Sequence, residues 1–197
     1  QVALMGHKVR RDLPRLVACA LLGVAINMVA FLEGLERSTT VNAACLMPVI
    51  PVYTLFIAVL VRQERFDPRR GAGIGLALVG TLLLLFQKGP EFGDEHFTGN
   101  LLFVLNTASY ALYLVLAKPL LARYPPLVVI AWVFTLSLWT IPLFHDGAAL
   151  VPSAASTGSW LSLGYILVFA TLVAYLLNAF ALSVVSASTT ATYILLQ

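Results

Sequence analysis

Long runs of apolar residues alternate with short polar segments along the whole chain. Six of these runs are long enough to cross a hydrocarbon core as a helix, which takes about 20 residues. No charged residue lies in the interior of any run, so each run is predicted to be a transmembrane helix. The six predicted helices cover residues 14–33, 40–61, 71–88, 99–118, 126–144 and 160–182.

A seventh apolar run begins near Ser186 and reaches Gln197, the last residue of the sequence. As a helix this run would rise only about 18 Å, whereas a hydrocarbon core is about 30 Å thick. The sequence also begins with glutamine and shows no signal peptide. We therefore expect an all-α, polytopic integral membrane protein, with six complete transmembrane helices and one truncated helix taken from a longer chain.

The composition agrees with lipid as the main solvent. Hydrophobic residues make up 60% of the chain and charged residues 11%, whereas soluble domains carry about 25% charged residues. The net charge of +3 does not indicate nucleic-acid binding, because the basic residues lie in short loops and form no basic face. Both cysteines, Cys19 and Cys45, lie inside apolar runs, so we expect packing residues rather than a disulfide.

Basic residues are concentrated in three of the predicted loops. Ten of the twelve lysines and arginines fall within or beside residues 1–13, 62–70 and 118–125. These loops lie on one side of the membrane if all six runs cross it, and the positive-inside rule makes that side cytoplasmic. We expect the chain in a membrane of the plasma-membrane type, such as the bacterial cytoplasmic membrane.

A faint internal repeat relates the two halves of the chain. Val24-Ala25 and Ala30-Phe31 recur as Val173-Ala174 and Ala179-Phe180, an offset of 149 positions. An offset of five spans turns the second copy upside down, and inverted repeats are typical of secondary transporters. We expect residues 1–92 to hold three helices of a first repeat and residues 93–197 to hold the start of a second.

Polar side chains form stripes on two of the apolar helices. The stripes are Asn106, Tyr110 and Tyr113 on one predicted helix, and Thr171, Tyr175 and Asn178 on another. Spacing of i, i+4, i+7 puts each set on one face, which must meet a wet cavity or another helix because lipid cannot satisfy it. Asn27 and Asn42 must likewise face either a wet cavity or another helix. Solute binding and interhelical hydrogen bonding both stay open as roles for these residues.

Prolines and glycines mark two further segments. Pro48 and Pro51 each remove a backbone donor from the second predicted helix, which indicates either a fixed kink or a gating bend. Gly71, Gly73 and Gly75 open the third predicted helix with the spacing of close helix packing. A dinucleotide site is excluded there, because the glycine spacing is wrong and no strand precedes it.

The sequence offers no enzyme chemistry. Its three histidines fall in predicted loops, and no Ser/His/Asp or Cys/His set is visible, so neither catalysis nor a metal or other cofactor is expected. The expected partners are the lipid bilayer and a small-molecule metabolite, and not nucleic acid. A homodimer is left open.

The order of these motifs resembles the EamA-type domain of the drug/metabolite transporter superfamily. The first half carries Asn27, Phe31 to Leu35, Ser38 to Thr40, Asn42 to Ala44, Pro48 and Glu64; the second carries Tyr175, Ala181-Leu182, Ser188 to Thr190 and Leu195 to Gln197. Met28 departs from the pattern, since the family often has glutamine there. The resemblance implies a ten-helix inverted-repeat parent whose cavity would draw on Asn27, Asn42, Asn106, Tyr110, Tyr175 and Thr190.

Together these observations predict a transporter that exports or exchanges small organic metabolites, such as amino acids, by alternating access. A multi-helix receptor or assembly subunit that transports nothing is the alternative, and the inverted repeat weighs against it.

Overall fold

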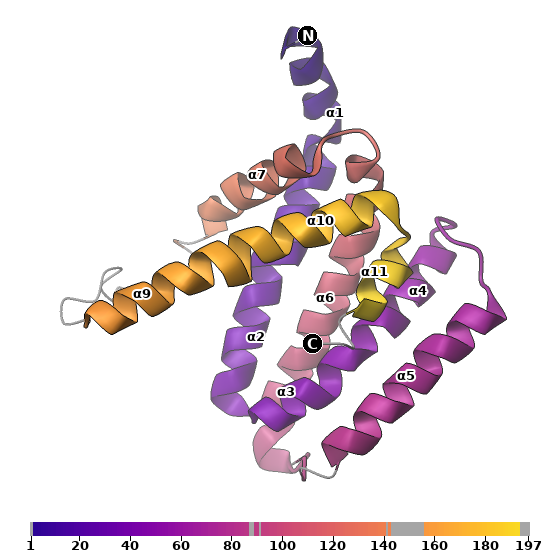
Figure 1. Cartoon of the computed structure of the whole chain (residues 1–197), viewed down its shortest axis with the longest axis vertical. Helices are drawn as coiled ribbons and strands as arrows, with labels where there is room; N and C mark the ends of the chain where they lie inside the picture. Colours follow the sequence, from indigo (N-terminus) through magenta and orange to yellow (C-terminus); the bar gives the residue numbers. More distant parts are fainter. Residues whose placement is uncertain (1, 87–88, 91, 141, 143–155, 194–197) are drawn as a thin grey trace.

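The computed structural model describes residues 2–86, 89–90, 92–140, 142 and 156–193, which form helices joined by short turns without a strand among them (Figure 1). Four stretches are long and apolar enough to cross a membrane: Arg10–Arg37, Thr40–Leu60, Asp94–Leu121 and Thr157–Val184. The prediction of a helical membrane protein is therefore confirmed. Six crossings and a ten-helix repeat stay predictions.

The two other predicted spans are helical over their described residues. Helix α5 (Pro68–Phe86) has 19 residues, with Arg69 and Arg70 in its first turn. A shorter apolar helix covers Pro126–Thr140. The ends of the predicted spans, at residues 87–88 and 143–144, lie outside the described residues, as do His145 and the last four residues of the seventh apolar run.

The first membrane-length stretch is one long helix with a widened turn inside it. Helix α1 (Val2–Ala20) passes into a π-helical segment, η1 (Leu21–Ala25), and continues as α2 (Ile26–Arg37). The chain then turns sharply at residues 38–40, here called the first corner. Ser38 is extended, and the Thr39 hydroxyl accepts a hydrogen bond from the Asn42 amide (3.1 Å), which caps the next helix.

Pro48 and Pro51 lie where one helix gives way to another. Helix α3 (Thr40–Leu46) is followed by a 3-10 turn, η2 (Met47–Val49), and then by α4 (Ile50–Leu60). Both prolines are buried and fall within the first two positions of a helical segment, where a missing N–H costs little. The structure therefore has a change of helix type at the prolines, while a gating role stays a prediction.

Helix α6 (Phe97–Leu121), preceded by the 3-10 turn η3 (Asp94–His96), is the central element. It contacts helices from both halves of the chain, namely α1, α2, α3, α4, α7, α10 and α11. Its Phe103, Leu114 and Ala117 side chains are fully buried, and Tyr113 is almost so. The core of the bundle is therefore built around α6, behind α10 in the view of Figure 1.

The second half of the chain contains three elements in the same order as the first half. Helix α7 (Pro126–Ser137) and the 3-10 turn η4 (Leu138–Thr140) come first. Then α9 (Thr157–Tyr165), a π-helical segment η5 (Ile166–Val173) and α10 (Ala174–Val184) form one long helix. A second corner, residues 185–187, leads to α11 (Ala187–Thr192), with the Ser186 hydroxyl accepting from the Thr189 amide (3.3 Å). Each half therefore contains a π segment, a helix and a capped corner in the same order.

The two corners pack against opposite ends of α6. Ser38 of the first corner donates to the Asn100 side chain (2.7 Å), and Lys118 donates to the carbonyl of Val185 in the second (2.6 Å). Asn100 and Lys118 are 18 positions apart, which is about 27 Å along a helix. The structure thus has one corner at each end of its central helix.

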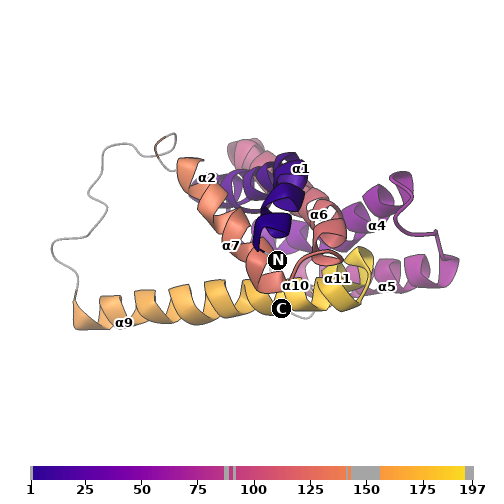
Figure 2. The same ribbon diagram turned by 90° about the horizontal axis from the view of Figure 1, so that it is seen from above.

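Two elements lie at the margin of the bundle. Helix α9 extends away from the other helices (Figure 2), and its residues are exposed, Trp160 included. Helix α5 does not place its glycines at a close contact: a Cβ at Gly73 or Gly75 would meet nothing within 4 Å, and one at Gly71 would meet only the ring of Phe66. No described helix comes close to these glycines in this chain, and their role in close packing stays a prediction.

Candidate functional site

A cluster of polar side chains joins helices from both halves of the chain near the middle of α6. Asn27 of α2 donates from its side chain to the backbone carbonyl of Asn106 (3.2 Å), and Asn106 donates to the carbonyl of Asn27 (2.8 Å). Both side chains are buried. This reciprocal pair ties α2 to α6, and an amide in that position needs such partners because lipid offers none.

Helix α10 joins the same cluster through a tyrosine and an amide. The Asn178 side chain donates to the Tyr110 hydroxyl (3.1 Å), and the Tyr175 hydroxyl donates to the carbonyl of Gly23 (3.4 Å). The Tyr175 ring meets Phe134 of α7 edge-on, with 5.1 Å between the ring centroids. We call Gly23, Asn27, Asn106, Tyr110, Tyr175 and Asn178 the central polar cluster.

Two residues of this region were not predicted from the sequence. A Cβ at Gly23 would lie 2.5 Å from the ring of Tyr113, so only glycine fits there without a shift of that ring. Ser109 donates to the carbonyl of Leu22. Both contacts fall on the π segment η1, whose widened turn exposes backbone carbonyls, a feature frequent at functional sites. Gly23, a glycine within an apolar helix, was the one feature of the sequence that could have indicated these contacts.

The central polar cluster is bonded internally: Asn27 and Asn106 are buried, while Tyr110, Tyr175 and Asn178 are partly buried. Within the described part of the chain, no buried side-chain nitrogen or oxygen lacks a hydrogen-bond partner. The three cavities described below are lined by other residues. In this structure the side chains of the cluster therefore bond helices to one another.

Three of the predicted site residues lie apart from the central polar cluster. Asn42 donates to Ser38 (3.0 Å) and Asn100 (3.1 Å) at the first corner. Thr190 donates within α11 to the carbonyl of Ser186 (3.1 Å). Thr171 is half-buried in η5. Six of the nine predicted residues therefore meet in or directly beside the cluster, with Tyr113 stacked near Tyr110 at 5.7 Å between centroids.

A second polar site holds the second corner at the end of α6. Glu64 accepts hydrogen bonds from the amide (3.0 Å) and hydroxyl of Ser188 and pairs with Arg70 at 3.1 Å. Lys118 donates to the carbonyls of Leu182 (2.7 Å) and Val185 (2.6 Å). A cavity of about 180 Å³ lies between these groups. The loop after α4, the end of α6 and the second corner thus meet at one end of the bundle.

A groove of about 410 Å³ runs between α5 and α11. It is lined by Arg70, Gly73, Ile74, Ala77, Thr189, Thr192 and Tyr193. Gly73 and Ala77 are the small residues of α5 that line this groove.

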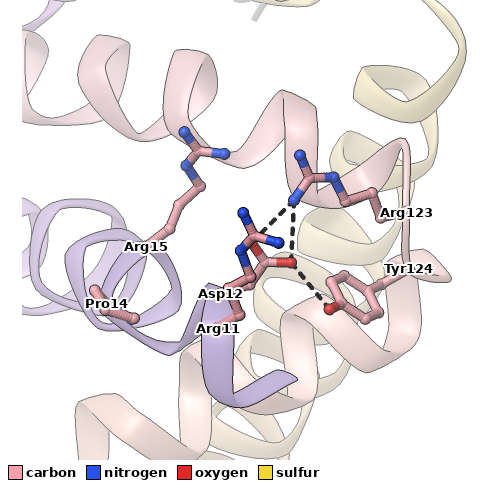
Figure 3. A pocket seen from close by; sticks show the side chains of 6 residues that line it. All are labelled: Arg11, Asp12, Pro14, Arg15, Arg123 and Tyr124. Carbon is pink, nitrogen blue, oxygen red and sulfur yellow. Dashed lines mark hydrogen bonds and ion pairs between the residues drawn. The ribbon is translucent and has the colours of Figure 1, made fainter. Parts of the chain in front are cut away.

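The largest of these cavities, about 740 Å³, lies where α1 passes the end of α6 (Figure 3). Its lining residues, here called the arginine pocket, are Arg11, Asp12, Pro14, Arg15, Arg123 and Tyr124. Since Lys118 and Arg123 are five positions apart, this pocket lies at the same end of α6 as the second corner. The three predicted basic loops therefore meet at one end of the bundle.

This arrangement defines a helical membrane protein whose two halves meet in a polar centre. Residues 2–86 and 97–197 match the EamA-like transporter family. The chain belongs to that family, which confirms the resemblance drawn from its motifs.

Relatives of the chain are named as transporters. An uncharacterized transporter of Archaeoglobus fulgidus is 24% identical over 144 residues, which are 73% of this chain and 50% of that protein. A probable terminal-alkyne amino-acid exporter of Streptantibioticus cattleyicolor is 29% identical over 156 residues, 76% of this chain and 50% of that protein. The chain thus spans about half the length of these relatives.

A solved crystal structure shares the fold. It superposes with a TM-score of 0.62 at 18% sequence identity, covering 98% of this chain and 79% of that chain. At this identity the likeness concerns the arrangement of helices alone.

Proposed function

We propose that this chain is part of a carrier that exports or exchanges small organic metabolites, with amino acids or related solutes as the first class to test. The observation that carries the proposal is the central polar cluster, which joins α2, α6 and α10 in a member of a transporter family. The name of the Streptantibioticus relative, an amino-acid exporter, supports the choice of solute.

The proposed parent has ten helices in two inverted repeats, one represented by residues 1–92 and the other by 93–197. Three observations support it: the family match falls in two segments, each half has a π segment, helix and capped corner in the same order, and the two corners lie at opposite ends of α6. Opposite placement is what an upside-down second copy requires.

In the proposed cycle the hydrogen bonds of the cluster break when α10 and its π segment move away from α2 and α6. The amide and hydroxyl groups that now bond to each other would then be free to bind the solute, while Phe134 and Tyr175 supply an aromatic wall. Asn42, Thr171 and Thr190 are proposed to line the path at a distance from this cluster. The basic end, including residues 1–13, 62–70 and 118–125, is proposed to face the cytoplasm.

Counterflow in proteoliposomes tests the proposal with the full-length protein that contains this chain. Vesicles are preloaded with amino acids, sugars or nucleotide-type metabolites, and the labelled compound is added outside. We expect accumulation of amino acids. Tyr175→Phe removes one hydroxyl and keeps the ring contact, so we expect an initial rate about tenfold lower, the effect of about 1.4 kcal/mol.

Tyr165→Phe is the matched control, because it makes the same change on the preceding helix at a side chain that is 65% exposed. Its rate should equal that of the wild type. If both variants accumulate the labelled compound at the wild-type rate, Tyr175 does not belong to the solute path. No accumulation of any class by folded protein would favour the receptor or assembly subunit instead.

A further inference from the structure

The arginine pocket has an unbalanced charge. Three guanidinium groups, those of Arg11, Arg15 and Arg123, point into a common space around a single carboxylate, that of Asp12 (Figure 3). With three positive charges and one negative, the pocket carries a net charge of +2. Neither the central polar cluster nor the second corner involves any of these residues, so the proposed transport site does not account for them.

Asp12, the one carboxylate of the pocket, already accepts hydrogen bonds from two neighbouring side chains. Arg123 donates to both Asp12 oxygens (3.0 and 3.2 Å), and the Tyr124 hydroxyl donates to one of them (3.0 Å). Burial raises the pKa of Tyr124, and the hydrogen bond to Asp12 acts in the same direction, so this hydroxyl stays a donor at neutral pH. Asp12 therefore fixes the position of Arg123 at the rim of the pocket.

Arg11 and Arg15 have no acidic partner among the described residues. They are four positions apart on α1, so their side chains lie on the same face of the helix and repel each other. An exposed pair of this kind can be solvated separately, but here a third guanidinium faces the same cavity. Such a set of planar, fixed cations matches the oxygens of a phosphate group, which guanidinium forks bind bidentately.

The depth of the pocket in the membrane indicates where the phosphate group comes from. One membrane-length stretch begins at Arg10 and another ends at Leu121, and the pocket residues stand within a few positions of these two ends. We infer that the cavity lies near the level of the bilayer phosphates, because it stands at the ends of two membrane-length helices. Basic pockets between transmembrane helices at this level are suited to anionic headgroups.

We propose that Arg11, Arg15 and Arg123 form a binding site for a phosphate group, supplied by an anionic phospholipid of the surrounding leaflet. Arg11 and Arg15 hold the phosphate oxygens from α1, and Arg123, held in place by Asp12, approaches from the end of α6. A bound headgroup would join α1 to the α6–α7 turn at the rim of the bundle.

Native mass spectrometry of the delipidated full-length protein tests the site. Phosphatidylglycerol and zwitterionic phosphatidylcholine are titrated separately, and the lipid-bound fraction is measured. The double variant Arg11→Gln/Arg15→Gln leaves the Asp12 contacts intact. We expect tight phosphatidylglycerol binding that weakens at least about tenfold in this variant, since each basic side chain near the surface contributes about 1 kcal/mol.

The matched control is Arg65→Gln/Arg69→Gln, which removes two exposed positive charges at the same end, one from the loop after α4 and one from the first turn of α5. It should change binding less than twofold. Equal losses in the two double variants would show that net charge alone attracts the lipid, and the site would be rejected. Equal binding of the two lipids by the wild type would reject it as well.

A competition experiment with soluble phosphates distinguishes the two sources of phosphate. Glycerol 3-phosphate and inorganic phosphate are added as competitors, and at millimolar concentration they should leave the lipid-bound fraction unchanged. Displacement by either, lost in Arg11→Gln/Arg15→Gln, would assign the site to a soluble phosphate and overturn the lipid as its source. If the glutamine variant does not fold, Arg11→Lys/Arg15→Lys keeps the charge without the guanidinium fork, and undiminished binding would contradict bidentate recognition.

Discussion

Lys118 is the residue whose removal should most clearly weaken the second corner. Its ammonium group donates at 2.7 Å to the carbonyl of Leu182 and at 2.6 Å to that of Val185, where α10 ends and its last carbonyls have no helical partner. Lys118→Met keeps the length of the side chain and removes both bonds. A hydrogen bond to a charged group contributes about 1.5–3 kcal/mol, and the cost of desolvating the lysine offsets part of two such bonds. We therefore expect a loss of about 3 kcal/mol.

Thermal unfolding in detergent measures this loss directly. At about 2–4 °C per kcal/mol for a chain of this size, the Tm should fall by roughly 6–12 °C. A thiol-reactive dye can follow the transition, because Cys19 and Cys45 are both buried and react only on unfolding. Arg65→Met removes an exposed charge at the same end and should shift the Tm by less than about 2 °C. A Lys118→Met variant that melts within about 2 °C of the wild type would refute the role assigned to these bonds.

Three further predictions use the same thermal assay. Gly99→Ala should lower the Tm by about 4–8 °C, because its Cβ would lie 2.7 Å from backbone atoms of Arg37 and 2.5 Å from the Cβ of Ser38, whereas Gly75→Ala meets nothing within 4 Å and should not lower it. Asn106→Ala leaves the carbonyl of Asn27 without its donor and should cost about 1–2 kcal/mol; an unchanged Tm would contradict this. Because the pKa of Tyr124 is raised above its ordinary value of 10.0, its stabilising contribution is fully present below pH 10 and is lost as the pH rises through the folded-state pKa. The Tm difference between the wild type and Tyr124→Phe should therefore be constant from about pH 6 to 9 and shrink at higher pH.

The helical spacing of polar residues predicted much of the central polar cluster. Asn106 and Tyr110 share a face of α6 because of their spacing alone, and the same rule pairs Tyr175 with Asn178. Their partners could not be predicted, since a spacing within one helix says nothing about which helix lies opposite. The contact of Tyr175 with the carbonyl of Gly23 depends on the π segment η1, and no pattern in its apolar residues signals that widened turn.

Small residues on α5 led to the expectation of close helix packing, which stays a prediction because no described helix of this chain lies against Gly73 or Gly75. Gly71, Gly73 and Gly75 allow another backbone to come close, but the pattern does not say that one does. The sequence did not predict that Glu64 and Lys118 bind the second corner, for the opposite reason. Charged residues at the ends of membrane spans are ordinary, so their bonds to Ser188 and Leu182 became visible only when the two halves of the chain were brought together.

The way in which the second corner is held has a consequence for the order of events during synthesis. Its binding groups, Glu64 and Lys118, precede it in the chain by 124 positions, counted from Glu64 to Ser188, and by 67, counted from Lys118 to Val185. A membrane protein is made from its N-terminus onward, so both groups have left the ribosome long before residues 185–187 appear. The second corner therefore reaches binding groups that are already in place. A chain that stops before this point would leave Glu64 without the Ser188 contacts and Lys118 without its carbonyl acceptors.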